Sequence, residues 1–243
     1  MARTTDDARS THRLPGMLRP TSGRRPDTTA FSITAIVVVV AFGFVLSKTH
    51  GVVHLDLQGV KALNRLHTGA LGTLGATVYK VFSPAEAIIL TVVIVAVIWA
   101  VSRNLRLAAT FAVTVAVTWL SSDIVKLLVH RARPDRSAFA HHITEHPTDP
   151  SFPSGHMVFV ATLAMAFVFL TRDKPYRGWV VAAGIVAVLV VAFSLISDGV
   201  HYPSDVTASV VWSVGVAPLV LGLWNRYVLP LTYRTPSSVE APA

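Results

Sequence analysis

The sequence predicts an all-α protein, a polytopic membrane helix bundle with about six transmembrane helices. Of its 243 residues, 52% are hydrophobic and only 14% are charged, whereas a soluble domain carries about a quarter charged residues. The mean hydropathy is +0.56. Several apolar runs also continue without charge for about the length that a membrane-crossing helix needs.

The first 30 residues predict a disordered basic arm on the cytoplasmic side. They hold six arginines, three prolines and almost no periodic apolar residues, a composition that cannot bury a core. A signal peptide would end in a small-residue cleavage site, so we interpret the apolar run that follows as a retained anchor. The arginines then act as orientation signals.

Six apolar runs are the candidate spans, and they define one membrane domain over residues 31–228. The stretch 48–82 has apolar residues near helical spacing but too many charges to cross a bilayer, so we expect one or two helices at the membrane surface or against the bundle. Residues 229–243 predict a disordered tail. The predicted spans are 31–47, 84–101, 107–129, 155–170, 179–196 and 206–223.

Charge sets the orientation of these spans. An even number of spans places both termini on one side, together with two short loops. That side holds 13 of the 21 Lys and Arg residues and the other side holds 8. Since basic residues accumulate in the cytoplasm, the loop 130–153 and the turn 197–205 are predicted to face the extracytoplasmic side.

Composition also excludes some functions. The net charge of +8 is spread over short loops and one tail instead of lining one face, so no nucleic-acid partner is predicted. The chain has no cysteine, which excludes disulfides and thiolate chemistry.

Three predicted outer helix ends carry residues capable of chemistry. Lys126 and Arg133 lie seven residues apart, which is two turns on one face if the helix continues that far. The run 153–156, Pro-Ser-Gly-His, begins the fourth span, where free backbone N–H groups bind anions. His201 and Asp205 lie four apart, close enough for the carboxylate to fix the tautomer of the imidazole.

Each of these groups also has an ordinary structural interpretation. Lys126 could pair with Asp123, Ser154 could cap a helix, and Asp205 could cap the next one. A metal site is a further interpretation, but no recognised ligand spacing occurs, so we expect no metal and no cofactor. Such a site would draw on His201, Asp205 and some of His130, His141, His142 and His146.

The order and spacing of these groups resemble the type 2 phosphatidic acid phosphatase superfamily of membrane lipid phosphate phosphatases. Its motifs are Lys-x6-Arg-Pro, Pro-Ser-Gly-His and Ser-Arg-x5-His-x3-Asp. They are matched here by Lys126, Arg133 and Pro134, by Pro153, Ser154, Gly155 and His156, and by Ser194, His201 and Asp205.

One position departs from the family pattern. The third-motif arginine, a phosphate ligand in the family, is Leu195 here, and Asp198 in the same turn would repel a phosphate. Arg131 or Arg136 could take the place of the missing ligand. The departure keeps a second interpretation open, a non-catalytic lipid-phosphate binding or flippase-like protein.

The resemblance implies an integral membrane lipid phosphatase that needs no metal. His201, oriented by Asp205, would form a phosphohistidine, and His156 would transfer protons to the leaving group and from water. Lys126, Arg133, Ser154 and the N–H of Gly155 would bind the phosphate. The active site would face the extracytoplasmic side of the cell membrane.

The resemblance also names classes of substrate. These are polyprenyl phosphates or diphosphates such as undecaprenyl diphosphate, phosphatidylglycerol phosphate and phosphatidate. The expected partners are therefore a lipid phosphate substrate and membrane lipid, and the sequence predicts no oligomeric state.

Overall fold

The computed structural model describes residues 15–18, 26–141, 143 and 147–233. Within these ranges every regular element is a helix, so the predicted all-α class is confirmed. The α-helices are α1 (Pro26–Lys48), α2 (His50–Asn64), α3 (Gly69–Val81), α4 (Pro84–Ser102), α5 (Leu105–Val129), α6 (Gly155–Leu170), α7 (Arg177–Ser197) and α8 (Pro203–Leu223). Short helical turns cover Gly16–Leu18, Arg136–Ala138, Trp224–Val228 and Leu229–Tyr233.

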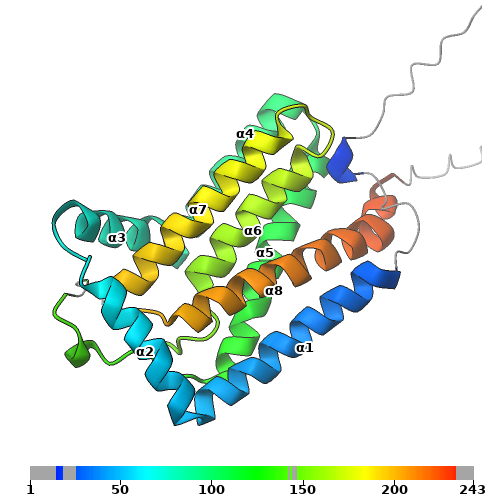
Figure 1. The fold of residues 1–243 in the computed structure, drawn as a ribbon. Coiled ribbons are helices and arrows are strands. Elements are labelled where there is room, and N and C mark those ends of the chain that lie inside the picture. Colours follow the sequence, from blue (N-terminus) through cyan, green and yellow to red (C-terminus); the bar gives the residue numbers. More distant parts are fainter. Residues whose placement is uncertain (1–14, 19–25, 142, 144–146, 234–243) are drawn as a thin grey trace, which may run out of the picture.

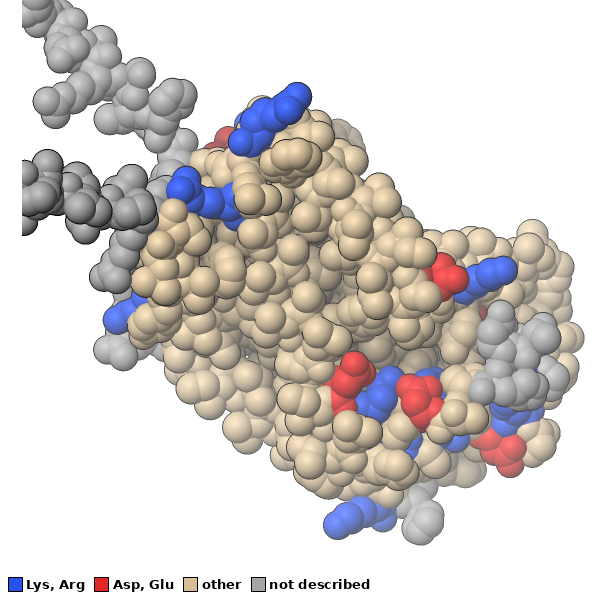
Figure 2. All heavy atoms as spheres, turned by 180° about the vertical axis from the view of Figure 1, so that it is seen from behind, with Lys and Arg blue, Asp and Glu red and all other residues tan. Residues whose placement is uncertain are grey.

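Six of these helices correspond to the predicted spans. Five described helices are long and apolar enough to cross a membrane, and α6 is a shorter apolar helix. Many of their large apolar side chains point outward, such as Val101 at 82% exposed and Leu127 at 71%. The charged side chains on the face seen in Figure 2 lie toward opposite ends, with a broad band of other residues between them. The chain is a multi-pass membrane protein.

The two ends of the chain differ in detail from the predicted boundaries. Inside the predicted arm, Gly16–Leu18 form a helical turn in which Met17 and Leu18 are 1% exposed. The first helix begins at Pro26, ahead of the predicted Phe31. The rest of the arm, and the tail from residue 234, lie outside the described residues.

α6 is the central helix of the bundle. It packs against α5, α7 and α8, while α1 lies along the outer side of α8 (Figure 1). α1 begins and α8 ends at the same end of the bundle. Because α6 lies among α5, α7 and α8, residues 154–156 at its N-terminus are surrounded by neighbouring helices and do not lie at the edge of the bundle.

Hydroxyl groups join α6 to α8. Ser209 receives a hydrogen bond from the backbone N–H of Ser154 at 2.8 Å and donates to the backbone at Asp205 at 2.6 Å. One turn further, Ser213 donates to the backbone at Ser209 and lies 3.2 Å from the hydroxyl of Thr162. Apolar burial does little to hold helices together within lipid, so these buried hydroxyls fix how the two helices are aligned.

The stretch 48–82 forms two helices, as expected. α2 and α3 pack against α7 at the end of the bundle where α6 begins (Figure 1). Asn64 of α2 donates to the carbonyls of His141 and Ser197 at 2.5 and 2.7 Å. A side chain at Gly75 would collide with the carboxylate of Asp198, so the glycine lets α3 approach the turn between α7 and α8.

Candidate active site

Lys126 and Arg133 meet at one carboxylate, that of Asp149. Lys126 Nζ lies 2.6 Å from Asp149 Oδ2, and an Arg133 terminal nitrogen lies 2.8 Å from Asp149 Oδ1. Arg133 Nε also donates to the Asp149 carbonyl at 2.9 Å. Lys126 and Arg133 thus bind a single oxyanion together, and this pair of cationic side chains is the grip.

The helix does not continue far enough for Lys126 and Arg133 to share one of its faces. α5 ends at Val129, and His130 adopts a left-handed conformation with φ of 48°. Arg133 therefore lies in the following loop and not two turns further along a helix. The loop returns on itself, since the backbone N–H of Ser151 donates to the Arg131 carbonyl at 2.8 Å. This loop path brings Arg133 back toward Lys126.

The pairing holds the Asp149 carboxylate ionised. Burial alone would raise its pKa, but hydrogen bonds and positive charge from Lys126 and Arg133 outweigh this and hold the pKa well below the usual range. Its side chain is 48% exposed, so an incoming anion can reach the same position from solvent.

His201 lies between the Asp205 carboxylate and the Arg133 guanidinium. Its Nδ1 is 3.5 Å from Asp205 Oδ2, and its Nε2 is 3.1 Å from an Arg133 terminal nitrogen. An arginine has only N–H donors, so Nε2 must be the acceptor and Nδ1 carries the proton. This tautomer leaves the lone pair of Nε2 beside the cation grip.

The surroundings of His201 favour its neutral form. The side chain is fully buried. Burial, and then the positive charges of Arg133, Lys126 and His156, lower its pKa well below the usual value, and the negative charge of Asp149 opposes them. The imidazole is therefore neutral and nucleophilic at neutral pH.

The residues at the start of α6 lie beside the grip. Ser154 is fully buried and its hydroxyl accepts from the backbone N–H of Met157 at 3.4 Å, so the capping interpretation is correct for this residue. A side chain at Gly155 would lie 3.7 Å from Lys126 Nζ. The first N–H groups of α6 are thus close to the cation that an anion would bind.

His156 is held by α3. Its Nε2 lies 3.1 Å from the Tyr79 carbonyl, and its ring stacks on the Tyr79 ring with centroids 4.5 Å apart. A carbonyl can only accept, so Nε2 donates and Nδ1 is the nitrogen left for proton transfer. α3 thus orients this imidazole.

Leu195 does not face the grip. Its side chain is fully buried in the main hydrophobic core, and its carbonyl is 3.3 Å from the backbone nitrogens of Val200 and His201. Asp198 is also buried, with its carboxylate 3.0 Å from His67 Nδ1. Leu195 therefore supports the turn that carries His201.

Neither predicted substitute for the missing arginine reaches the grip. Arg131 donates to Asp205 at 2.5 Å and to Asp56 at 2.8 Å. Arg136 donates to the carbonyl of Ile143. Lys126 pairs with Asp149 and not with Asp123, the partner in the alternative structural interpretation.

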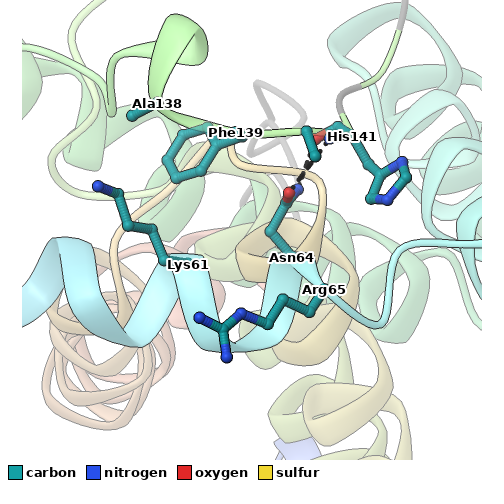
Figure 3. Close-up of a pocket in the computed structure, with 7 residues that line it drawn as sticks. Lys61, Asn64, Arg65, Ala138, Phe139 and His141 are labelled. Atoms are coloured by element: carbon teal, nitrogen blue, oxygen red, sulfur yellow. Dashed lines mark hydrogen bonds between the residues drawn. The ribbon is translucent and has the colours of Figure 1, made fainter.

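The motif residues line neither a large cavity nor a metal site in the described part of the chain. A cavity of about 360 Å³ between α2 and residues 138–141 is lined by Lys61 and Arg65, with none of the motif residues (Figure 3). Within the described ranges, no three His, Asp or Glu side chains gather closely enough to hold a metal ion. His142 and His146 lie outside those ranges.

Sequence reasoning missed three residues in or next to this site. Asp149 and Tyr79 belong to no motif, and their contacts depend on the paths of a loop and of a peripheral helix. Asp56 had a signal that could have identified it, because it is the single acidic residue in the stretch 48–82.

Comparisons with known proteins find a family model and a solved structure that match this chain. The PAP2 superfamily model matches residues 105–228, the range that holds all three motifs. A solved transmembrane PAP2-type phosphatidylglycerolphosphate phosphatase from Bacillus subtilis has a TM-score of 0.66, at 20% identity, over 81% of this chain and 94% of that one. This likeness shows the fold.

Two curated relatives match over shorter ranges. An undecaprenyl-diphosphatase of Sulfolobus acidocaldarius is 30% identical over 46% of this chain and 52% of its own length. A decaprenylphosphoryl-5-phosphoribose phosphatase of Mycobacterium tuberculosis is 37% identical over 40% of this chain and 50% of its own. The chain thus spans about half the length of these curated relatives.

Proposed function

The chain belongs to the PAP2 superfamily, and from this premise we propose that it is a membrane lipid phosphatase that needs no metal. One observation carries the proposal: Lys126 and Arg133 grip a single carboxylate beside the Nε2 of His201. A phosphate oxygen has the charge and hydrogen-bonding character of a carboxylate oxygen. The grip is therefore suited to a phosphate ester next to a nucleophile.

The proposed reaction has two steps. Nε2 of His201 attacks phosphorus, so that a P–N bond forms and the bond to the leaving oxygen breaks, while His156 gives that oxygen a proton. A water molecule then attacks the phosphohistidine and gives its proton to His156, which releases phosphate and restores His201. Lys126, Arg133 and the N–H of Gly155 stabilise the charge on the phosphoryl oxygens, and the capping hydroxyl of Ser154 lies beside them.

We propose a polyprenyl phosphate or diphosphate as the substrate class. Two relatives are named for polyprenyl substrates, whereas the structural neighbour is named for phosphatidylglycerolphosphate. Phosphatidate remains in the panel to be tested. The distribution of Lys and Arg supports an extracytoplasmic active site in the cell membrane.

Phosphate release tests the proposal directly. Purified protein in detergent, with a chelator and no added metal, is supplied with polyprenyl diphosphate, polyprenyl phosphate, phosphatidylglycerol phosphate and phosphatidate. We expect release from at least one lipid. The alternative is the non-catalytic binder or flippase-like protein that Leu195 suggests, and it predicts tight binding of a lipid phosphate with no release.

Asp149 is expected to compete with substrate for the grip. Its carboxylate must leave before a phosphate can contact Lys126 and Arg133. Asp149→Asn removes the competing charge, so we expect KM for the lipid phosphate, and the inhibition constant of inorganic phosphate, to fall about tenfold. Steady-state kinetics with inorganic phosphate as inhibitor measure both.

Asp135→Asn is the matched control for this variant. Asp135 lies in the same loop, but its side chain accepts from the backbone N–H of Ser137 and does not contact the grip. Its constants should stay at the wild-type values. A rise in KM for Asp149→Asn would mean that Asp149 builds the site instead of competing for it.

The pH profile of the reaction follows from His201. Its lowered pKa means that the nucleophile stays neutral as the pH falls through about 6.5, the ordinary histidine value. The loss of kcat/KM on the acid side should therefore occur below pH 6.5. A profile from pH 4 to 8, corrected for titration of the substrate phosphate by ³¹P NMR, measures it.

Lys126→Met tests the electrostatic cause of this lowered pKa. Removal of a positive charge near His201 raises the pKa of the imidazole, so the acid limb should move to higher pH even though the rate is lower. An acid limb above 6.5 in the wild type would contradict the proposed state of His201.

A further inference from the structure

A buried arginine lies behind the pair formed by His201 and Asp205. Arg131 is 3% exposed. One terminal nitrogen donates to Asp205 Oδ1 at 2.5 Å, and the other donates to Asp56 Oδ2 at 2.8 Å. Its guanidinium also lies over the Tyr202 ring, 4.1 Å from the centroid. Both terminal nitrogens are thus engaged inside the protein and away from the phosphate grip.

The two carboxylate oxygens of Asp205 have different partners. Oδ1 accepts from Arg131. Oδ2 accepts from the backbone N–H of Tyr202 at 3.0 Å and faces His201 Nδ1. Rotation of this carboxylate would break a buried charged hydrogen bond, which is costly. Arg131 therefore keeps Oδ2 directed at the imidazole.

Asp56 holds Arg131 in turn. It lies on α2 with a side chain 9% exposed. Its Oδ1 accepts from the backbone N–H of Ser204 at 3.1 Å, and its Oδ2 accepts from the Ser204 hydroxyl. Since Ser204 precedes Asp205, Asp56 fixes both Arg131 and the first turn of α8.

The group holds one positive charge and two carboxylates. Arg131 lies between two carboxylates, so neither Asp56 nor Asp205 is a lone charge in a buried setting. Loss of Asp56 would remove one of the two carboxylates that hold the Arg131 guanidinium in place. The arrangement is therefore coupled, and a change at Asp56 reaches His201 through Arg131 and Asp205.

We infer that Asp56 and Arg131 are positioning residues for His201, and that α2 completes the active site through Asp56. Neither residue touches the position of the substrate phosphate. They act by fixing the Asp205 carboxylate, which sets the tautomer and direction of the imidazole. The inference rests on the proposed function in one respect, that His201 is the nucleophile.

Asp56→Asn tests the inference by kinetics and by NMR. The substitution keeps the shape of the side chain and removes its charge. We expect kcat to fall at least about tenfold with KM within about twofold of wild type, because Asp56 binds no substrate group. We also expect the ¹⁵N signals of His201, assigned by their loss in His201→Ala, to depart from the Nδ1-protonated tautomer.

A control and a second variant accompany this test. Gln58→Ala changes an exposed residue of the same helix, whose side chain contacts His54, and should keep wild-type kcat and His201 signals. Ser204→Ala removes the hydroxyl that donates to Asp56 and accepts from Arg131 at 2.7 Å, without leaving a charge unpaired. It therefore tests the same group if Asp56→Asn does not fold. Its kcat should lie between those of wild type and Asp56→Asn.

The outcomes separate the inference from the proposed function. Wild-type kcat and wild-type His201 signals in folded Asp56→Asn, with only a lower melting temperature, would overturn the inference. If the wild type itself releases no phosphate from any lipid, the proposed function fails. The NMR comparison still decides whether Asp56 positions His201.

Discussion

Replacing His201 by alanine is expected to abolish phosphate release while leaving the helical bundle intact. The imidazole is the nucleophile of the proposed reaction, and the other imidazole of the site, that of His156, has its Nε2 held by the Tyr79 carbonyl. Loss of a nucleophile lowers turnover by several orders of magnitude, so we expect a fall of at least about 10³-fold. Phosphate release under single-turnover conditions measures it.

Two comparisons make this result specific. His54→Ala removes an exposed histidine of α2 and should retain full turnover. Gel filtration of both variants in detergent should match the wild type, and the cavity left by the fully buried imidazole should lower the melting temperature of His201→Ala without unfolding the protein. Undiminished turnover of His201→Ala would refute the phosphohistidine mechanism.

Arg133→Ala is expected to lower kcat/KM by at least about a hundredfold. Arg133 contacts Asp149 at the position proposed for the phosphate, and it donates to the Val200 carbonyl at 2.8 Å as well as contacting His201. Each hydrogen bond to a charged group contributes about 1.5–3 kcal/mol, and two such bonds account for the expected loss. Because Leu195 stands in place of the third-motif arginine, Arg133 is also the only motif arginine at the position proposed for the phosphate.

Arg133→Lys and Arg172→Ala complete this experiment. Lysine keeps the charge but cannot form the planar fork of an arginine, so its kcat/KM should lie between wild type and Arg133→Ala. Arg172 follows the far end of α6 and its loss should leave kcat/KM unchanged. If Arg133→Ala loses tenfold or less, Lys126 alone is enough to bind the phosphate.

The spans were predictable because a bilayer leaves few alternatives to a long apolar helix. The runs 84–101 and 155–170 agree closely with α4 and α6. The two helices of the stretch 48–82 were also expected from their periodicity. The start of α1 was not, since the polar residues ahead of Phe31 gave no apolar signal even though the helix includes them.

The site was predictable where its residues follow one another in sequence. His201 and Asp205 are four apart and do meet across the start of α8. Contacts made by loop paths were not predictable. Asp149 reaches Lys126 across 23 residues, and Asp56 reaches Arg131 across 75. No local spacing rule encodes such distances, because they depend on how whole helices pack.

The length of α6 bears on the membrane around the protein. Sixteen residues at 1.5 Å each span about 24 Å, which is less than the ~30 Å of a typical hydrocarbon layer. A helix bordered by lipid would accommodate such a mismatch by thinning the bilayer or by snorkelling of its flanking residues. α6 is enclosed by α5, α7 and α8 and tied to α8 through Ser209 and Ser213. The depth of its first turn is therefore set by contacts with neighbouring helices and not by lipid contact alone.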